Sequence, residues 1–283
     1  MKEVKIKGVK LIFRTSFVTK LYLMKNRKLF LILFLCLISG LGHAQNPRLK
    51  YFGLEAGSTF FGGEMTSMDF IRSSTSSYHM MDYSADNLSS FSNKYSLGLK
   101  LELMSLNDRF GLLSGLRYSR ISSTVEKSDY WFGNSDFFYW LYRQEGVDTE
   151  YLRVRGFNQY SDYLGIPIEL RYYTGSRPRR IQFYLKVGME INFLMASTSD
   201  VDFYNSAMSR YEDDLTSMLK KPKAVNTAIY GGGGFKFGRD QKPSISVEAF
   251  PYVFLSSKHA GIVEPSVGGG FQVSYQLPIK PNH

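Results

Sequence analysis

Apolar and polar side chains alternate with a period of two residues in eight separate segments of this 283-residue chain. In the longest segment, every odd-numbered position from Ile181 to Met195 carries a large apolar side chain, whereas Lys186 and Glu190 occupy even-numbered positions. Successive side chains of a β-strand point to opposite faces, so this period predicts strands with one apolar and one polar face. The predicted strands are residues 51–60, 95–104, 110–121, 162–173, 181–196, 225–238, 244–256 and 264–277.

The connections between these strands differ in length in a regular way. Three long connections, residues 61–94, 122–161 and 197–224, alternate with turns of five to seven residues, and the last connection, 257–263, is also short. Loops of that length are unusual inside a compact soluble domain. Short turns on one side and long loops on the other are typical of outer-membrane barrels. The sequence therefore predicts an all-β fold, an eight-stranded antiparallel transmembrane up-and-down β-barrel with long extracellular loops.

The polar face of the predicted strands carries acids and bases in equal number. A soluble barrel of eight strands also alternates, so the contents of this face decide between the two environments. Eight strands enclose a lumen that side chains just fill, and opposite charges can pair there, whereas a bare charge facing lipid costs about 2–4 kcal/mol. We therefore expect a lumen ion-pair ladder that leaves no conducting channel, formed by Glu55, Lys100, Glu102, Arg117, Glu169, Arg171, Lys186, Glu190, Lys236 and Glu248.

Residues 1–44 are predicted to form an N-terminal extension and a signal peptide that is removed on export. Basic residues follow Met24, an uncharged apolar run comes next, and the sequence Gly42-His43-Ala44 supplies small residues for cleavage. The alternative is an uncleaved anchor, but the apolar run is shorter than the ~20 residues that span a bilayer. Met24 is then the expected translation start, and residues 45–283 are the barrel domain. Cys36, the single cysteine, leaves with the signal, so no disulfide is expected.

The formal net charge of +10 is concentrated in the leader. Residues 1–44 hold nine of the 35 basic residues and one of the 25 acids, so the remainder is nearly neutral. Phosphate binding needs clustered positive charge, and we expect no nucleic-acid partner. The mean hydropathy of −0.21 excludes a bundle of membrane helices. The expected partners are outer-membrane lipid and an envelope protein or a glycan, with no cofactor.

One strand resembles a known family. The segment Tyr163-Leu164-Gly165-Ile166-Pro167-Ile168-Glu169-Leu170-Arg171-Tyr172 is similar to the Tyr-Leu-x-Ile-Pro-Leu-x-x-Lys/Arg-Tyr strand of the PorT-type bacterial outer-membrane β-barrel family. The glycine-rich segments at 231–238 and 268–275 are similar to later strands of that family. The resemblance implies an eight-stranded barrel in the bacterial outer membrane. Because the family is heterogeneous, it implies location and fold better than activity.

Loop 122–161 contains both tryptophans of the chain. Exposed rings in this loop could stack on sugars or anchor a partner protein. The alternative is an aromatic girdle at the membrane interface, or strands that extend above the membrane and pack on each other. The candidate partner-binding aromatics are Trp131, Tyr139, Trp140 and Tyr142.

The sequence contains no nucleophile or metal-binding motif of a known type, so no catalytic or metal-ligating residue is assigned. His79 and His259 fall in predicted outer loops near serines and Asp82, which leaves an outer-membrane lipid-modifying enzyme as one alternative. A narrow pore or an accessory to secretion is another. The expected function is a non-enzymatic surface protein that binds a partner or supports envelope assembly or secretion through its long outer loops.

Overall fold

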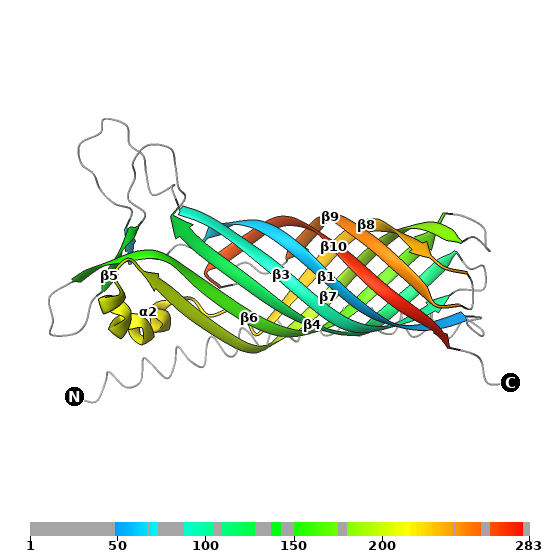
Figure 1. Cartoon of the computed structure of the whole chain (residues 1–283), viewed down its shortest axis with the longest axis horizontal. Helices are drawn as coiled ribbons and strands as arrows, with labels where there is room; N and C mark the ends of the chain where they lie inside the picture. The colour runs from blue at the N-terminus through cyan, green and yellow to red at the C-terminus, as the bar shows by residue number, and fades with distance from the viewer. Residues whose placement is uncertain are drawn as a thin grey trace, which may run out of the picture. The chain divides into compact units, whose positions relative to one another are not determined.

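The computed structural model describes residues 49–66, 68, 70–72, 88–104, 109–127, 137–142, 150–174, 180–239, 242–255 and 261–279. Eight of its strands close into an antiparallel barrel, in the order β6-β4-β3-β1-β10-β9-β8-β7, and the β6–β7 pairing completes the ring (Figure 1). This confirms the predicted fold class. The barrel strands are β1 (Leu49–Met65), β3 (Leu88–Met104), β4 (Phe110–Lys127), β6 (Glu150–Tyr173), β7 (Ile181–Phe203), β8 (Val225–Phe237), β9 (Ser244–Leu255) and β10 (Val263–Ile279).

The two faces of the barrel wall have the predicted polarity across the membrane-spanning region. Leu185 and Val187 point outward with half or more of their surface exposed, while Lys186 between them is 1% exposed. The same alternation runs along the other strands, where the outward side chains are Leu, Val, Ile, Phe and Tyr. An apolar outer wall suits lipid, and closure of the ring pairs the backbone groups for which hydrocarbon offers no partner.

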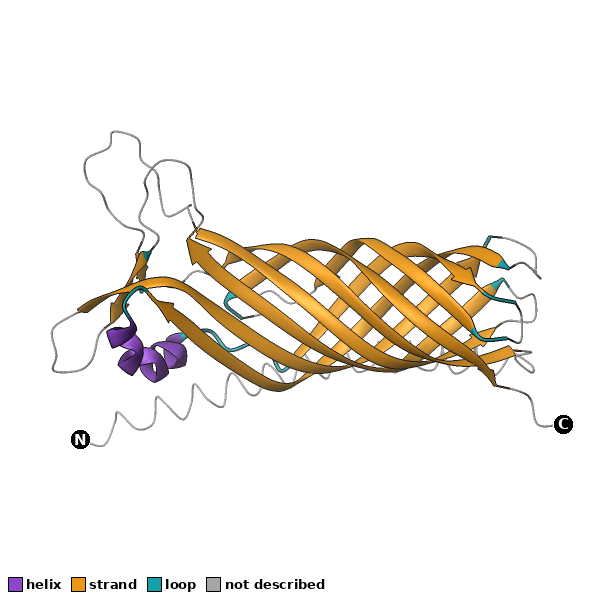
Figure 2. Ribbon diagram, in the orientation of Figure 1, coloured by secondary structure: helices purple, strands orange, loops and turns teal. Residues whose placement is uncertain are grey.

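Strands β1, β3, β4, β6 and β7 continue outward beyond their predicted ends by five or more residues. Short strands and helices lie beside these outer parts (Figure 2). The additional elements are β2 (Ile71–Arg72), β5 (Phe138–Tyr142), the 3-10 helix η2 (Ser206–Tyr211) and α2 (Glu212–Met218). Strand β5 pairs with β6, and β2 pairs with β5. We call this part the extension; it comprises residues 62–66, 68, 70–72, 88–93, 120–127, 137–142, 150–162, 196–224 and 261–263.

Much of the predicted long connections is therefore strand, and the predicted outer ends of β1, β3, β4, β6 and β7 were wrong, whereas β8 begins at the predicted residue 225. Strand β6 begins at Glu150 rather than residue 162, and β7 ends at Phe203 rather than residue 196. The β6–β7 register shifts twice. Arg155 is an extra residue of β6 between Val154 and Gly156, and Met195 is an extra residue of β7 opposite Asp162 and Tyr163. Each extra residue reverses which positions of its own strand face inward, so the alternation breaks beside Arg155 in β6 and beside Met195 in β7.

The extension has its own apolar core. Leu152 and Val154 face inward from β6, and Leu215 of α2 closes over them, all three with essentially no exposed surface. Fully burying each such side chain contributes about 1.5–3 kcal/mol, which accounts for ordered structure outside the lipid. The core consists of Met68, Val125, Phe138, Trp140, Tyr142, Leu152, Val154, Phe157, Val201, Phe203, Leu215, Leu219, Ile262 and Val263.

Of the helices in the described part of the chain, none has the length and apolar character needed to cross a membrane. The predicted leader, residues 1–44, lies outside the described residues, so the expected signal peptide and the Met24 start remain predictions. Because the long connections of such barrels are extracellular, the extension lies on the cell-surface side, and the short turns after β3, β6 and β8 lie on the periplasmic side.

Candidate functional site

Among the described residues, eleven charged side chains are buried in the barrel lumen, and we call them the lumen network. All ten residues predicted for the ion-pair ladder are among them, each 5% exposed or less. They project inward from all the barrel strands except β10, which contributes glutamines instead. The network consists of Glu55, Lys94, Lys100, Glu102, Arg117, Glu169, Arg171, Lys186, Glu190, Lys236 and Glu248.

Arg171 organises the periplasmic end of the network. Its Nη1 lies 3.3 Å from the Glu102 carboxylate, and its Nη2 donates to the Glu248 carboxylate. Lys186 pairs with Glu248 as well, and Lys236 lies 3.8 Å from Glu102. Each buried carboxylate therefore faces more than one cation, which offsets the desolvation that burial imposes on a charge.

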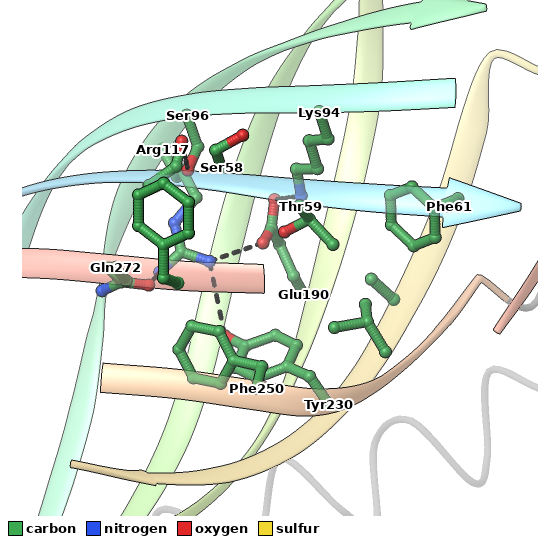
Figure 3. Close-up of a pocket in the computed structure, with 14 residues that line it drawn as sticks. Ser58, Thr59, Phe61, Lys94, Ser96, Arg117, Glu190, Tyr230, Phe250 and Gln272 are labelled. Carbon is green, nitrogen blue, oxygen red and sulfur yellow. Dashed lines mark hydrogen bonds and ion pairs between the residues drawn. The ribbon is translucent and has the colours of Figure 1, made fainter. Parts of the chain in front are cut away.

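Arg117 organises the outer end, where Figure 3 shows it pointing toward Glu190 and Tyr230. It donates through Nε to Glu55 (2.6 Å) and through Nη1 to Glu190 (2.6 Å). Its Nη2 donates to Glu169 at 3.0 Å. One guanidinium thus bridges three carboxylates on three different strands, a geometry that the planar fork of donors permits.

Lys94 is the one charged member of the network that sequence reasoning missed. Its ammonium lies 2.7 Å from Glu190, above Arg117, and the side chain is 7% exposed. The predicted strand began at Tyr95, although Lys94 has the same parity as Lys100 and so belongs to the same face. Extending the strand by one residue would have revealed it.

Three tyrosines on the lumen face also went unassigned. The hydroxyls of Tyr173, Tyr184 and Tyr230 each donate to a carboxylate at 2.7 Å, to Glu102, Glu248 and Glu169 respectively. Tyr173 and Tyr184 pair directly across β6 and β7, with ring centroids 5.2 Å apart, and the Arg171 guanidinium carbon lies 4.7 Å from the Tyr184 ring centroid. Inward tyrosines at the parity of the charged residues are the signal, because a phenol supplies both bulk and a donor.

Glycines opposite the carboxylates leave the room that these side chains need. A Cβ on Gly165 would lie 2.7 Å from Glu190 Oε1, and a Cβ on Gly98 would lie 2.9 Å from Glu55 Oε1. Each glycine faces the lumen beside a glutamate of the adjacent strand, so a larger residue would displace the carboxylate from its cations.

Little free space remains inside the lumen network. A cavity of about 30 Å³ lies at its outer end, lined by Lys94, Arg117, Glu190, Tyr230 and Phe250 among others (Figure 3). A space of this size holds about one water molecule. The arrangement can fix the barrel shape and block the lumen.

The candidate partner-binding aromatics fall in different places. Trp140 is fully buried in the extension core and Tyr142 is 8% exposed, so their burial removes both from a binding surface. This corresponds to the alternative interpretation of strands that extend above the membrane and pack on each other. Tyr139 is partly exposed on the outer face, edge-on to Tyr151 with ring centroids 6.2 Å apart. Trp131 lies outside the described residues.

The acidic run at 212–214 begins helix α2 and helps to attach it. The Tyr142 hydroxyl donates to Asp214 at 2.6 Å, and this hydrogen bond to a carboxylate raises the pKa of the tyrosine above its usual value. The lysines at 220, 221 and 223 are exposed. Among the described residues, no three His, Cys, Asp or Glu side chains come together to hold a metal ion. His79 and His259 lie outside these residues.

The sequence matches one family model over most of its length. The model of the outer membrane protein beta-barrel domain matches residues 44–250. Among solved structures, the chain is similar to the outer membrane protein OprG from Pseudomonas aeruginosa, with 13% identity and a TM-score of 0.39 over 80% of this chain and 95% of that chain. It is also similar to Ail of Yersinia pestis, with 10% identity and a TM-score of 0.28 over 82% of this chain and 98% of that chain. No curated protein matches the sequence.

Proposed function

Because the chain belongs to the outer membrane protein beta-barrel domain family and resides in the bacterial outer membrane, we propose that it is a non-enzymatic surface protein that binds a partner through its extension. The partner is an envelope protein or a glycan, and the binding supports envelope assembly or secretion. The barrel serves as the membrane anchor that presents the extension at the cell surface.

The observation that carries this proposal is the blocked lumen. Charged and tyrosine side chains fill the lumen from Glu102 at the periplasmic end to Lys94 at the outer end, and the cavity at the outer end has a volume of about 30 Å³. An ion that entered would have to displace salt bridges such as Arg117 to Glu190. This favours a role for the outer surface over a role as a narrow pore.

We further propose that the chain is of the PorT type, on the basis of the Ile166-Pro167 strand. Pro167 has no N–H to donate, and the β4–β6 pairing skips the positions between Gly165 and Ile168. On the β4 side of this gap, Gly115 passes so close to Leu99 that a Cβ would lie 1.9 Å from its carbonyl oxygen. The motif therefore corresponds to a definite feature of the barrel wall.

Site-specific photo-crosslinking in intact cells tests the surface role. A photoreactive residue is placed at Ser217 or Thr198, both exposed on the extension, or at the lipid-facing Val187 as the matched control. We expect discrete adducts with an envelope protein or a glycan at the extension positions and lipid adducts alone at Val187. Identical adduct patterns at all three positions would contradict the proposal.

Planar-bilayer recordings of the purified barrel test the blocked lumen directly. We expect no steady conductance, and steady single-channel currents would overturn the proposal in favour of transport. The lipid-modifying alternative is examined by comparing the lipid A mass of cells with the native chain and with the double variant His79→Ala and His259→Ala. A lipid A modification that disappears in the variant would establish an enzyme instead.

A further inference from the structure

A groove lies on the outer face of the extension, between β6 and the turn that leads from β7 into η2. Its volume of about 520 Å³ falls within the range of small-ligand sites, about 300–1,000 Å³. It is separate from the lumen network, and its residues were not assigned from the sequence. We call it the outer groove; it is lined by Tyr151, Arg153, Tyr204, Asn205, Ser206 and Met208.

Backbone and ring contacts fix the walls of the outer groove. The Tyr204 N–H donates to the Arg153 carbonyl at 3.0 Å and ties one wall to the other. Asn205 caps η2, with its side-chain oxygen accepting from the Ala207 N–H at 3.0 Å. The Phe137 ring supports both sides, since its centroid lies 5.0 Å from the Tyr204 ring and 5.0 Å from the Arg153 guanidinium carbon. The groove is therefore largely formed before any ligand arrives.

The chemistry of the outer groove combines aromatic faces with a cation. Tyr151 and Tyr204 are 56% and 41% exposed. Arg153 is exposed too, and no ion pair joins its guanidinium to a carboxylate within the described parts of the chain. The opposite wall offers the polar side chains of Asn205 and Ser206. An isolated inorganic anion would use the arginine and leave the tyrosine faces unused.

The position of the outer groove points to a saccharide environment. The apolar outer wall of β6 ends at Leu164, and the exposed salt bridge between Arg120 and Asp162 marks the edge of the lipid-facing band. Arg153 lies nine residues further out along β6, a distance of about 30 Å at ~3.3 Å per residue. The groove is thus held beyond the lipid, at the level of surface sugars.

We infer that the outer groove binds an acidic saccharide. A sugar ring lies against the Tyr151 ring or the part of the Tyr204 ring that Phe137 and Arg155 leave uncovered. Its carboxylate, phosphate or sulfate accepts two hydrogen bonds from Arg153, and hydroxyl groups bind Asn205 and Ser206. This inference rests on the proposed function and supplies the chemical class of the partner. The acidic saccharide comes from one of two sources, the lipopolysaccharide of the same membrane or a glycan outside the cell.

Calorimetric titration of the purified full barrel in detergent micelles tests the inference. The probes are trigalacturonic acid, which is acidic, and maltotriose, which is neutral. We expect saturable binding of the acid and binding at least tenfold weaker for maltotriose. Arg153→Gln should weaken trigalacturonic acid binding at least tenfold, and Tyr204→Ala should weaken it severalfold. Equal binding of the two probes, or no binding, would overturn the inference.

The matched control is Lys221→Gln, which removes one exposed positive charge elsewhere on the extension. Its trigalacturonic acid binding should equal that of the native protein. A loss equal to that of Arg153→Gln would show that the effect depends on net charge alone, and it would overturn the site. Heat-modifiable gel mobility verifies that each variant is folded. A short polyglutamate peptide that binds as tightly as trigalacturonic acid would also overturn a saccharide site.

The source of the saccharide is determined by a second pair of titrations. Lipopolysaccharide of the producing bacterium is titrated into the native and Arg153→Gln proteins. Arg153-dependent binding identifies the same membrane as the source of the saccharide, and binding of trigalacturonic acid without binding of lipopolysaccharide identifies a glycan outside the cell. If Arg153→Gln abolishes saccharide binding but leaves the crosslinks at Ser217 and Thr198 unchanged, the groove is not the partner surface, although the proposed function stands. If no extension position crosslinks to any partner, the proposed function is wrong, whatever the titrations show.

Discussion

Strand β6 runs through two regions of opposite polarity. In the membrane-spanning part, Glu169 faces the lumen and Leu170 faces outward, whereas in the extension Leu152 faces inward and Arg153 faces outward. The lipid region buries charges and exposes apolar side chains, and the extension does the reverse. The same strand therefore satisfies two solvents, since burial of apolar surface is favourable only where the outside is water.

Different interactions position the side chains in the two regions. Inside the membrane, side-chain specificity comes from salt bridges on different strands, such as Arg117 with Glu55 and Glu190. Outside it, specificity comes from close packing, such as Trp140 against Phe70 with ring centroids 4.7 Å apart. The two regions should respond in opposite ways to the same kind of substitution.

The largest effect is expected from breaking the lumen network at Arg171. Replacement by Leu leaves the carboxylates of Glu102 and Glu248 without one of their cations, and removal of one partner of a buried ion pair costs about 3–5 kcal/mol. Urea unfolding in lipid vesicles measures the change in the free energy of unfolding. Arg153→Leu on the outer face of the extension is the control, with an expected change of less than about 0.5 kcal/mol. Equal losses would contradict the difference in polarity.

A charge placed on the outer wall should have the next largest effect. Leu185→Arg puts a guanidinium against lipid and should destabilise the barrel by about 2–4 kcal/mol. Thr198→Arg makes a similar change on an exposed position of the same strand, but within the extension, and should be nearly neutral. The readout is the fraction of heat-modifiable, membrane-inserted protein. If Thr198→Arg blocks insertion as strongly, the lipid-facing band extends further out than the salt bridge of Arg120 and Asp162 suggests.

The sequence predicts the fold correctly in the band where the outer wall of the barrel faces lipid throughout. Between Leu164 and Tyr172 the alternation is unbroken, because lipid on one side and the lumen on the other impose opposite demands on every pair of positions. In β7 the phase changes at the extra residue Met195, where the outer solvent becomes water, and in β6 it changes further out, at the bulge between Val154 and Gly156. Periodicity alone gives no sign of a strand that changes both phase and polarity.

The candidate sites also divide into one that strand periodicity predicts, the lumen network, and one that it does not, the outer groove. Parity placed ten charges on one face and missed Lys94 by one residue, because facing depends only on local backbone geometry. It did not assign the outer groove, which brings Tyr151 and Arg153 next to Tyr204, about fifty residues away in the sequence. Such a site depends on the β6–β7 register and the turn into η2.

A cavity in the extension core should have an intermediate and local effect. Leu152→Ala removes a fully buried side chain and should cost about 2–3 kcal/mol. Leu170→Ala removes an equal volume from the lipid-facing wall of the same strand and should cost less, since lipid chains fill the space. Limited proteolysis of the extension, followed alongside heat-modifiable mobility, measures both. The comparison fails if Leu152→Ala leaves the extension as protease-resistant as Leu170→Ala does.

The smallest effect is expected at Lys94, where the two regions meet. Lys94→Gln removes the cation 2.7 Å from Glu190, but Arg117 still holds that carboxylate at 2.6 Å. The Lys94 side chain is also 7% exposed beside the small cavity, so water can reach the site that the ammonium leaves. We therefore expect a loss of about 1 kcal/mol, close to the net contribution of one hydrogen bond, and no steady conductance in planar bilayers.

Arg117→Gln is the matched variant. It removes the cation shared by three carboxylates and should cost several times more, because no second guanidinium replaces it. Equal losses from the two variants would mean that the outer end of the lumen is held by Lys94 as firmly as by Arg117, and a conducting Lys94→Gln barrel would mean that Lys94 itself closes it.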